Sequence, residues 1–470
     1  MKMDRYDLII IGGGAGGFAA ATRASELGAK VVIINSGLPI GGTCVNVGCV
    51  PSKVLLEIGS EYYNPQHPRF RAIRNGRPAI FDFAAAIREK DEMVAALRAS
   101  NYIKVAEGLA GLTVIEGRAR FLSPHRVEVN GQTLEAEKFV IATGSRSKIL
   151  PFPGIDKVHY LTNREALSLP RLPQSMVVIG AGPIGLEFAQ MYARFGTQVT
   201  VLEKEGQILP LSEPEVADEL QRCLEEEGIV INTGVDVERV AEERGVKRVE
   251  ATYEGQHLMF EGAELLLATG VTPNTEDMGL ERAGVAVDGR GFITVSPELQ
   301  TSTPHIWAAG DVVGKMFLET VAAKEGYLAA GNALEGTRKS IDYDSVPRAV
   351  FTDPQVASVG ITETELMQRI NSCSCRTVEI AQVPKAQAIK ETRGLVKMIA
   401  HPETGIVVGV HMVAPMAADL IHEATLAVKF KLTVDDIIDT VHVFPTLSEA
   451  IKRVAQSFRR DISKMSCCVD

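Results

Sequence analysis

Two cysteines near the start of the chain have the type and spacing to do redox chemistry. Cys44 and Cys49 lie five positions apart in GGTCVNVGCVPSK, residues 41–53. If this segment is helical, both thiols lie near one face, close enough for a disulfide after modest distortion. Lys53 and a helix N-terminus would lower the pKa of a thiol there and raise its reactivity. The segment thus indicates a redox-active pair, with a structural disulfide, two buried thiols or half of a zinc site as the alternatives.

The other cysteines carry weaker signals. Cys467 and Cys468 are adjacent in KMSCCVD, where an exposed thiol pair without a use would be a liability. Cys373 and Cys375 form a C-x-C in RINSCSCRT, a predicted loop, and we favour incidental surface thiols there over metal capture. Cys223, on a predicted acidic helix, is interpreted as incidental. Seven cysteines, an odd number grouped in pairs, are not typical of a secreted disulfide framework.

Two segments of the chain share one pattern that is typical of nucleotide binding. YDLIIIGGGAGGFAAATRASELGAKVVIIN and SMVVIGAGPIGLEFAQMYARFGTQVTVLE both predict a strand, a glycine turn, a helix and a second strand. Each contains G-x-G-x-x-G directly after its first apolar run, at Gly12, Gly14 and Gly17 and again at Gly180, Gly182 and Gly185. Such glycines permit a tight turn and let backbone amides approach a pyrophosphate at a helix N-terminus. The repeat therefore predicts two dinucleotide sites.

The residue that ends each second strand indicates which dinucleotide is bound. In the second segment this residue is Glu203, whose carboxylate would repel a 2′-phosphate and therefore favours NADH over NADPH. The adjacent Lys204 weakens this inference. In the first segment this residue is Asn35, which could hydrogen-bond a ribose but carries no charge. The alternative is that Asn35 is a simple turn residue. A further apolar run, HIWAAGDVV, ends at Asp311, which suits a ribityl hydroxyl of a flavin, with a helix N-cap as the alternative.

Composition narrows the class of protein. The 470 residues carry a net charge of −10 and no long basic run, which argues against nucleic acid and anionic membranes as partners. The first residues lack a signal-peptide pattern, and no apolar run reaches the ~18 residues that span a bilayer. We therefore expect a cytoplasmic protein without membrane contact. The length suggests about three domains, and the pattern after residue 346 predicts a separate α+β unit that serves association.

The motifs in this order resemble the flavin-dependent pyridine nucleotide–disulfide oxidoreductases over essentially the whole chain. The dithiol segment, the two glycine motifs, ATGS, ATGVTPN, WAAGD and VFTDPQVASVG all occur in family order. The resemblance implies an α/β fold with two Rossmann-like domains and a C-terminal α+β domain. It places an FAD domain in residues 1–150 and 270–345, an NAD(P) domain in 151–269, and a dimerisation domain in 346–470. It also implies a homodimer with active sites at the subunit interface.

The resemblance further implies roles for single residues. Cys49 would lie nearer the flavin, Cys44 would be the interchange thiol, and Lys53 would pair with Glu187 beside the flavin. The FAD contacts would come from Gly12, Gly14, Gly17, Asn35, Gly42, Thr43, Lys53, Thr143, Gly144, Asp311 and Glu319. The NAD(P) contacts would come from Gly180, Gly182, Gly185, Glu203 and Gly270.

The segment HVFPTLSEA, residues 442–450, separates members of this family. It resembles the segment that brings a His-Glu pair from one subunit to the disulfide of the other, where the histidine moves protons for organic thiols. The aligned position is Phe444, whereas Glu449 is retained. His442, two positions upstream, could substitute, and a packed or surface histidine is the favoured alternative. The missing base argues against lipoamide or glutathione disulfide as the substrate.

A metal ion needs no such proton relay, and soft thiolates select soft metals. The Cys467-Cys468 pair resembles the hallmark of mercuric reductases, in which the tail of one subunit passes Hg(II), received as a thiolate complex, to the partner's inner pair. Tyr160 resembles a tyrosine near the metal, whereas Thr446 replaces a second tyrosine. The resemblance implies reduction of Hg(II) to Hg(0) by NAD(P)H through FAD and Cys44-Cys49. A dihydrolipoamide dehydrogenase-like disulfide reductase and a non-catalytic flavoprotein are the alternatives.

Overall fold

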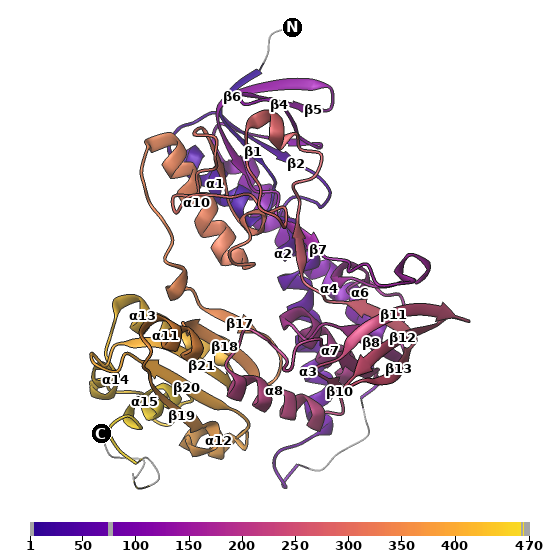
Figure 1. The fold of residues 1–470 in the computed structure, drawn as a ribbon, viewed down its shortest axis with the longest axis vertical. Helices are drawn as coiled ribbons and strands as arrows, with labels where there is room; N and C mark the ends of the chain where they lie inside the picture. Colours follow the sequence, from indigo (N-terminus) through magenta and orange to yellow (C-terminus); the bar gives the residue numbers. More distant parts are fainter. Residues whose placement is uncertain (1–3, 74–78, 462–463, 465–470) are drawn as a thin grey trace.

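The computed structural model describes residues 4–73, 79–461 and 464 of the chain. These residues form three units, each built around its own sheet (Figure 1). The first two sheets are mainly parallel and the last is antiparallel. The predicted fold class, α/β with two Rossmann-like units and a C-terminal α+β unit, is confirmed. Cys467 and Cys468 lie outside the described residues.

The first unit has a sheet whose central strands are buried on both faces. Leu8, Ile9 and Ile10 are fully buried, as expected of a parallel strand covered from both sides. The strand order is β3-β2-β1-β6-β5-β4, with β16 pairing β6. The bounds are β1 Asp4–Ile11, β2 Val31–Asn35, β3 Leu112–Glu116, β4 Arg120–Ser123, β5 Arg126–Val129, β6 Gln132–Ile141 and β16 Ile306–Ala308. This sheet therefore combines residues from the start of the chain with a strand far along it.

Helices α1 (Ala15–Glu26) and α10 (Glu319–Glu335) pack against each other on this sheet (Figure 1). Their contact needs glycine, because a Cβ on Gly326 would lie 1.9 Å from the carbonyl oxygen of Gly16. The helix α10, like β16, returns to the first unit from a distant part of the chain. The antiparallel ribbon of β7 (Ser145–Ser147) and β15 (Val271–Pro273) connects the first unit to the second.

The second unit contains two sheets. One is parallel, in the order β10-β9-β8-β14, and the other is antiparallel, in the order β11-β12-β13. The parallel strands are β8 Ser175–Ile179, β9 Gln198–Leu202, β10 Val230–Asn232 and β14 Glu264–Leu267. The antiparallel strands are β11 Asp236–Glu243, β12 Val246–Tyr253 and β13 Gln256–Gly262. Its helices include α7 Pro183–Phe195 and α8 Pro214–Glu226. The glycine motif of this unit links β8 to α7, as predicted.

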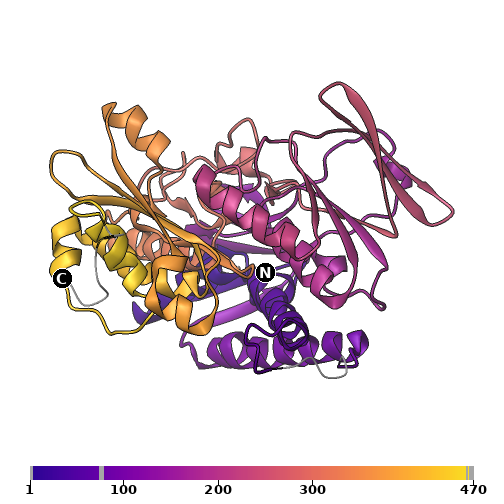
Figure 2. The same cartoon turned by 90° about the horizontal axis from the view of Figure 1, so that it is seen from below.

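The C-terminal unit is an antiparallel sheet with helices packed against it. The strand order is β17-β18-β21-β20-β19, with bounds β17 Arg348–Val350, β18 Gln355–Gly360, β19 Ser374–Glu379, β20 Leu395–Ala400 and β21 Val407–Ala414. The helices are α11 Glu363–Ile370, α12 Pro384–Ile389, α13 Ala417–Phe430, α14 Val434–Asp439 and α15 Glu449–Gln456. Seen from below, this unit and the second unit lie on opposite sides of the view (Figure 2).

Two helices from the early part of the chain leave the first sheet and pack on the second unit. These are α3 (Cys49–Tyr63) and α4 (Phe83–Arg98), and their buried side chains share a core with α7. The short helices are α2 Gly42–Val47, α5 Lys104–Gly108, α6 Asn163–Ala166 and α9 Leu280–Ala283, and a π-helical turn spans Ala99–Ile103. The helix that begins at Cys49 therefore joins the first two units.

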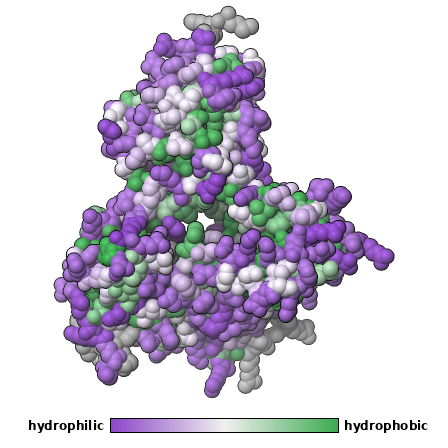
Figure 3. Space-filling model, viewed as in Figure 1, coloured by the Kyte–Doolittle hydropathy of each residue, from purple (hydrophilic) through white to green (hydrophobic). Residues whose placement is uncertain are grey.

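The surface in Figure 3 is mostly hydrophilic, with apolar residues scattered over it and a hollow where the three units meet. Within residues 4–73, 79–461 and 464, no helix is both long and apolar enough to cross a membrane.

Candidate active site

The two N-terminal thiols lie on consecutive helices rather than on one continuous helix. Cys44 is in α2, Cys49 begins α3, and Gly48 separates them. Any larger residue would be crowded at this break, because a Cβ on Gly48 would lie 2.9 Å from the carbonyl oxygen of Thr43. Both cysteines are free thiols, and the Cys44 thiol donates a hydrogen bond to Cys49. The structure thus brings together the pair that the spacing predicted.

The pKa values of the two thiols are shifted in opposite directions. The hydrogen bond from Cys44 lowers the pKa of Cys49, burial raises it, Lys53 lowers it further, and the net shift is downward. The same hydrogen bond, together with burial, raises the pKa of Cys44. Cys49 is therefore the more acidic thiol of the pair, and the thiolate is the form that attacks disulfides and binds metals.

Lys53 and Glu187 form the ion pair that the sequence predicted. Lys53 Nζ lies 2.7 Å from Glu187 Oε2, although the residues are 134 positions apart and belong to α3 and α7. The backbone N–H of Phe351 donates to Glu187 Oε1 at 2.9 Å, and Lys53 Nζ lies 4.4 Å from the centre of the Phe351 ring. Only 8% of the Glu187 side chain is exposed, so its charge depends on these partners. Phe351, on the third unit, was not singled out from the sequence.

The tyrosine beside the dithiol is Tyr102. Burial raises the pKa of Tyr102 to about 12, and electrostatic interactions with Cys44, Glu319 and Cys49 contribute in the same direction. Its ring packs edge-on against Phe18, with centroids 4.9 Å apart. No family motif marks the segment SNYIKV, so the sequence offered no signal for this residue.

Tyr160, the tyrosine proposed from the sequence, lies in the second unit. It lines a hollow of about 500 Å³ with Arg146, His159 and Arg164, and it packs on the apolar core of the second unit. Cys44 and Cys49 are not among the described residues that line that hollow. The role of Tyr160 stays a prediction, whereas the electrostatic contact with Cys44 and Cys49 belongs to Tyr102.

The first glycine loop and the dithiol helix form a cradle that fits a flavin nucleotide. A Cβ on Gly42 would lie 2.7 Å from the Cα of Gly14, so these two predicted contacts are adjacent and without side chains. The hydroxyl of Thr143 is buried and has no hydrogen-bond partner among the described residues. Buried polar atoms are rarely left unpaired, so this hydroxyl suits a ligand atom. Gly144, the next predicted contact, has open space where its Cβ would point.

Asp311 is positioned as a polar anchor rather than as a helix cap. It is the first residue of a 3-10 turn, Asp311–Val313, whose cap residue is Gly310. Burial raises the pKa of Asp311, against a 2.6 Å hydrogen bond that it accepts from Ser145 Oγ. Its other oxygen remains available to a ribityl hydroxyl.

Asn35 does not act alone at the end of β2. Its side-chain nitrogen donates to both carboxylate oxygens of Glu116, at 3.1 and 3.0 Å, and to the carbonyl oxygen of Leu38. Glu116 ends β3 directly opposite Asn35 in the sheet. A carboxylate is therefore present where a ribose would bind, but it comes from the neighbouring strand. The pattern LTVIEG, an apolar run ending in an acid and glycine, was the signal that could have identified Glu116.

The second glycine loop also leaves room for a ligand. A Cβ on Gly182 or on Gly270 would meet nothing within 4 Å, which is the open space that a pyrophosphate requires. Glu203 holds the loop: its carboxylate accepts from the backbone N–H of Ala181 at 2.7 Å and of Glu205 at 2.9 Å. Lys204, which weakened the prediction of NADH, is paired with Asp236 at 3.1 Å.

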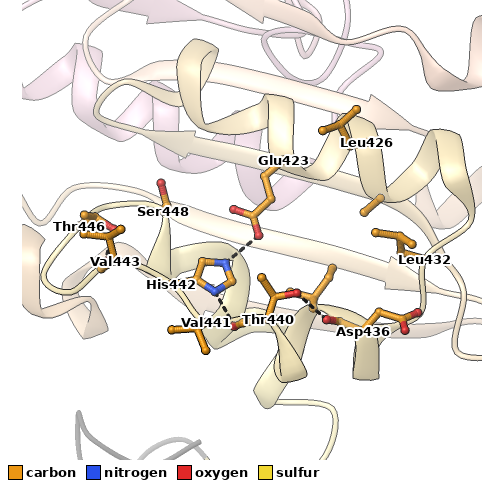
Figure 4. A pocket seen from close by; sticks show the side chains of 12 residues that line it. Glu423, Leu426, Leu432, Asp436, Thr440, Val441, His442, Val443, Thr446 and Ser448 are labelled. Atoms are coloured by element: carbon orange, nitrogen blue, oxygen red, sulfur yellow. Dashed lines mark hydrogen bonds and ion pairs between the residues drawn. The ribbon is translucent and has the colours of Figure 1, made fainter.

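The segment expected to supply a proton relay offers no free histidine. His442 Nε2 lies 2.7 Å from Glu423 Oε1 and Nδ1 lies 3.0 Å from the carbonyl oxygen of Thr440, so both ring nitrogens are engaged (Figure 4). This pair lies in the wall of a hollow of about 610 Å³. Phe444 is 53% exposed, whereas Glu449 is buried. The interpretation of His442 as a packed residue is therefore the one that the geometry favours.

Comparison with known proteins places this site in a family. The family model "Pyridine nucleotide-disulphide oxidoreductase" matches residues 6–326, and the model of its dimerisation domain matches residues 346–455. A mercuric reductase of Lysinibacillus sphaericus is 39% identical over 466 residues, 99% of this chain and 85% of that protein. Dihydrolipoyl dehydrogenase 1, mitochondrial, of Arabidopsis thaliana is 36% identical over 464 residues, 97% of this chain and 90% of that protein.

Solved structures agree with these matches. The Cu(II) complex of the HOCl-induced flavoprotein disulfide reductase RclA from Escherichia coli superposes with a TM-score of 0.86 at 29% identity, covering 97% of this chain and 100% of that chain. The chain thus belongs to the pyridine nucleotide–disulphide oxidoreductases, and it is an NAD(P)H-dependent flavoprotein enzyme of that family with FAD and a nicotinamide coenzyme as cofactors.

Proposed function

We propose that this enzyme reduces Hg(II) to Hg(0). The observation that carries the proposal is the combination of a dithiol in which the pKa of Cys49 is lowered with the absence of a free base in residues 440–450, all of which the structure describes. Phe444 occupies the position of the expected histidine, and His442 is held by Glu423 and Thr440. The 39% identity to a mercuric reductase supports the same substrate.

Chemistry at the dithiol suits a metal better than an organic disulfide. Reduction of an organic disulfide releases two thiols, and each sulfur needs a proton from a nearby acid. A bound Hg(II) needs no proton, because it takes up two electrons and leaves as a neutral atom. The Cys49 thiolate is ready to bind a soft cation, and Cys44 supplies the second sulfur after it releases its proton. Tyr102 and Glu319 border this position.

The residues of this chain would then act in a fixed order. In the proposed dimer, Cys467 and Cys468 of one subunit receive Hg(II) from a thiolate complex and pass it to Cys44 and Cys49 of the other. Bound FAD would supply the transfer of reducing equivalents from the nicotinamide, first to open the Cys44-Cys49 disulfide and then, as two electrons, to the metal held by the two sulfurs. Lys53, held by Glu187, keeps positive charge beside the Cys49 thiolate throughout. Neutral mercury has little affinity for thiolates, so the product leaves.

For the coenzyme, we propose NADH rather than NADPH. Glu203 presents a buried carboxylate at the end of β9, where a 2′-phosphate would be repelled. The only cation that adjoins it in sequence, Lys204, is paired with Asp236.

The test is oxidation of NADH and of NADPH by the purified flavin-loaded enzyme. Each coenzyme is supplied with Hg(II) plus excess thiol, with Cu(II), with lipoamide and with glutathione disulfide. We expect Hg(II)-dependent oxidation that is faster with NADH. Changing both Cys467 and Cys468 to Ala is expected to slow turnover of thiol-bound Hg(II). Oxidation that depends on lipoamide and not on Hg(II) would instead assign the enzyme to the lipoamide dehydrogenases, which also resemble it.

The variant Phe444→His tests the reason for this substrate choice. A histidine near Glu449 would restore an acid–base group, whose contribution to such reactions is about 10²- to 10⁴-fold. We expect turnover of lipoamide to rise by at least tenfold and turnover of Hg(II) to change little; Phe444→Leu is the matched control. A lipoamide rate that is equal in Phe444→His and Phe444→Leu would contradict the assigned role of this position.

A further inference from the structure

A second pair of thiols lies in the C-terminal unit, and only Cys373 is on a loop as the sequence suggested. Cys375 is in β19 and Cys373 directly precedes that strand, so both side chains face the same side of the sheet. The two sulfur atoms are 2.9 Å apart. Both cysteines are half-buried against the apolar residues Ile361 and Ile399. These are therefore not incidental surface thiols but neighbours with a shared environment.

A carboxylate completes the group. Glu363, the first residue of α11, has its Oε1 3.3 Å from Cys373 Sγ, and the potential ligand atoms of Glu363, Cys373 and Cys375 all lie within 4.8 Å of one another. Helix α11 and strand β19 are connected by residues 371–373, of which the first two are exposed. The group therefore combines two sulfurs and one oxygen from two elements of the same unit.

The orientation of Glu363 is set by a partner on its far side. Lys397 Nζ lies 2.7 Å from Glu363 Oε2, which leaves Oε1 directed at the thiols. Lys397 is itself 4% exposed and also contacts Glu213 at 2.7 Å and Glu215 at 2.8 Å. Three carboxylates against one ammonium give this region a net charge of −2 before either thiol ionises. In metal sites a ligand side chain is typically held by a further residue, as Lys397 holds Glu363 here, and the net negative charge favours binding of a cation.

We propose that Cys373, Cys375 and Glu363 bind a soft, thiophilic metal cation. Thiolate ligands select ions such as Cu(I) and Zn(II), and Hg(II) belongs to the same class. A tetrahedral ion with metal–sulfur bonds of ~2.3 Å separates its two sulfurs by about 3.8 Å, so modest side-chain rotations would open the pair to receive it. A fourth position would remain for solvent. This site is separate from Cys44 and Cys49 and does not depend on which substrate they reduce.

The test uses the full-length, flavin-loaded protein in which Cys44, Cys49, Cys467 and Cys468 are all changed to Ser. The reduced protein is titrated without oxygen, in one arm with Zn(II) against a chromophoric chelator and in another with Hg(II) against an excess of monothiol. We expect one equivalent of metal per chain in at least one arm, accompanied by thiolate-to-metal absorption, and none with Mg(II). The further changes Cys373→Ser and Cys375→Ser together should remove that equivalent.

Two controls identify the ligands. Cys223→Ser in the same background should retain the metal, because Cys223 is fully buried in the second unit. Glu363→Gln keeps the shape of the side chain and should weaken binding by at least about tenfold, the smallest loss expected when a supporting group of a metal site is removed. Flavin absorption confirms that each variant is folded. The proposal fails if the four-serine background binds neither metal, or if the equivalent persists after both Cys373 and Cys375 are replaced.

Discussion

At the scale of single residues, the charge on Cys49 depends on what surrounds it. An ordinary thiol is mostly protonated at neutral pH. Here a hydrogen bond from Cys44 and the charge of Lys53 together outweigh burial and the charge of Glu319, and they lower the pKa of Cys49. Lys53 in turn is held in place by Glu187, which comes from another unit. The reactive form of the site is therefore a property of a small charged network.

The variant Lys53→Met should raise the pKa of Cys49. A positive charge lowers the pKa of an acid, so its removal raises that pKa, and the thiolate then disappears at a higher pH as the solution is acidified. The measurement is the thiolate absorption of the reduced enzyme as a function of pH, with Cys49→Ser to assign the signal. Lys53→Arg, which keeps the charge, should leave the midpoint low. Because Glu187 loses its cation in Lys53→Met, the double variant Lys53→Met/Glu187→Met separates the two charges; an unchanged midpoint in both would contradict the role of Lys53.

At the scale of elements, the site depends on close backbone approaches. Gly48 allows α2 and α3 to meet at the dithiol, and Gly326 allows α10 to lie directly against α1. The second contact matters for the site because α10 begins at Glu319, whose charge reaches both thiols. The close packing of α10 against α1 therefore helps to fix where the charge of Glu319 lies relative to the dithiol.

The variant Gly326→Ala should destabilise the enzyme. Its new methyl group would lie 1.9 Å from the carbonyl oxygen of Gly16, and overpacking of this kind costs about 1–3 kcal/mol. Gly331→Ala on the same helix is the matched control, because its nearest neighbour would be 3.5 Å away. There alanine should be neutral or stabilise by up to about 1 kcal/mol through helix propensity. The midpoint of thermal unfolding, followed by flavin fluorescence, checks both; equal midpoints for the two variants would show that the helices can separate without cost.

At the scale of the whole molecule, charged groups buried between units fix how the units lie together. Lys397 on β20 of the C-terminal unit contacts Glu213, which immediately precedes α8 of the second unit. Burial lowers the pKa of Lys397, but its carboxylate partners outweigh burial and raise it. With the pKa raised, the stabilisation by this pair is fully present below the ordinary lysine pKa and is lost only as the pH rises through the higher value.

The variant Lys397→Met should destabilise the enzyme by about 3–5 kcal/mol, because it leaves the carboxylate of Glu213 buried without its cation. Lys204→Met is the control: its pair with Asp236 is exposed, with 73% and 67% of the side chains accessible, and should contribute less than about 1 kcal/mol. Denaturant midpoints measure both. Adding Glu213→Gln to Lys397→Met should recover part of the loss, and no recovery would mean that the buried charge is not its cause.

Much of the fold and the core of the site follow from short-range sequence patterns. Each glycine motif lies between a strand and a helix within about 30 residues, and Cys44, Cys49 and Lys53 occupy one ten-residue segment. Neighbours in sequence remain neighbours in space, and apolar runs must be buried, so these features could be predicted. Family resemblance added the pairing of Lys53 with Glu187, which spacing alone does not imply.

Tertiary structure decided the contacts between distant segments. Tyr102 interacts electrostatically with Cys44 and Cys49, Glu116 joins Asn35 from a neighbouring strand, and His442 is paired with Glu423. Even over the 10 positions between Glu363 and Cys373, the fold had to bring the start of α11 back beside β19 before a candidate metal site could be recognised. The sequence by itself determined which residues can do chemistry, because residue type and local spacing are written in it. Which of them act together depended on packing between elements, because side-chain partners far apart in the chain are set by that packing alone.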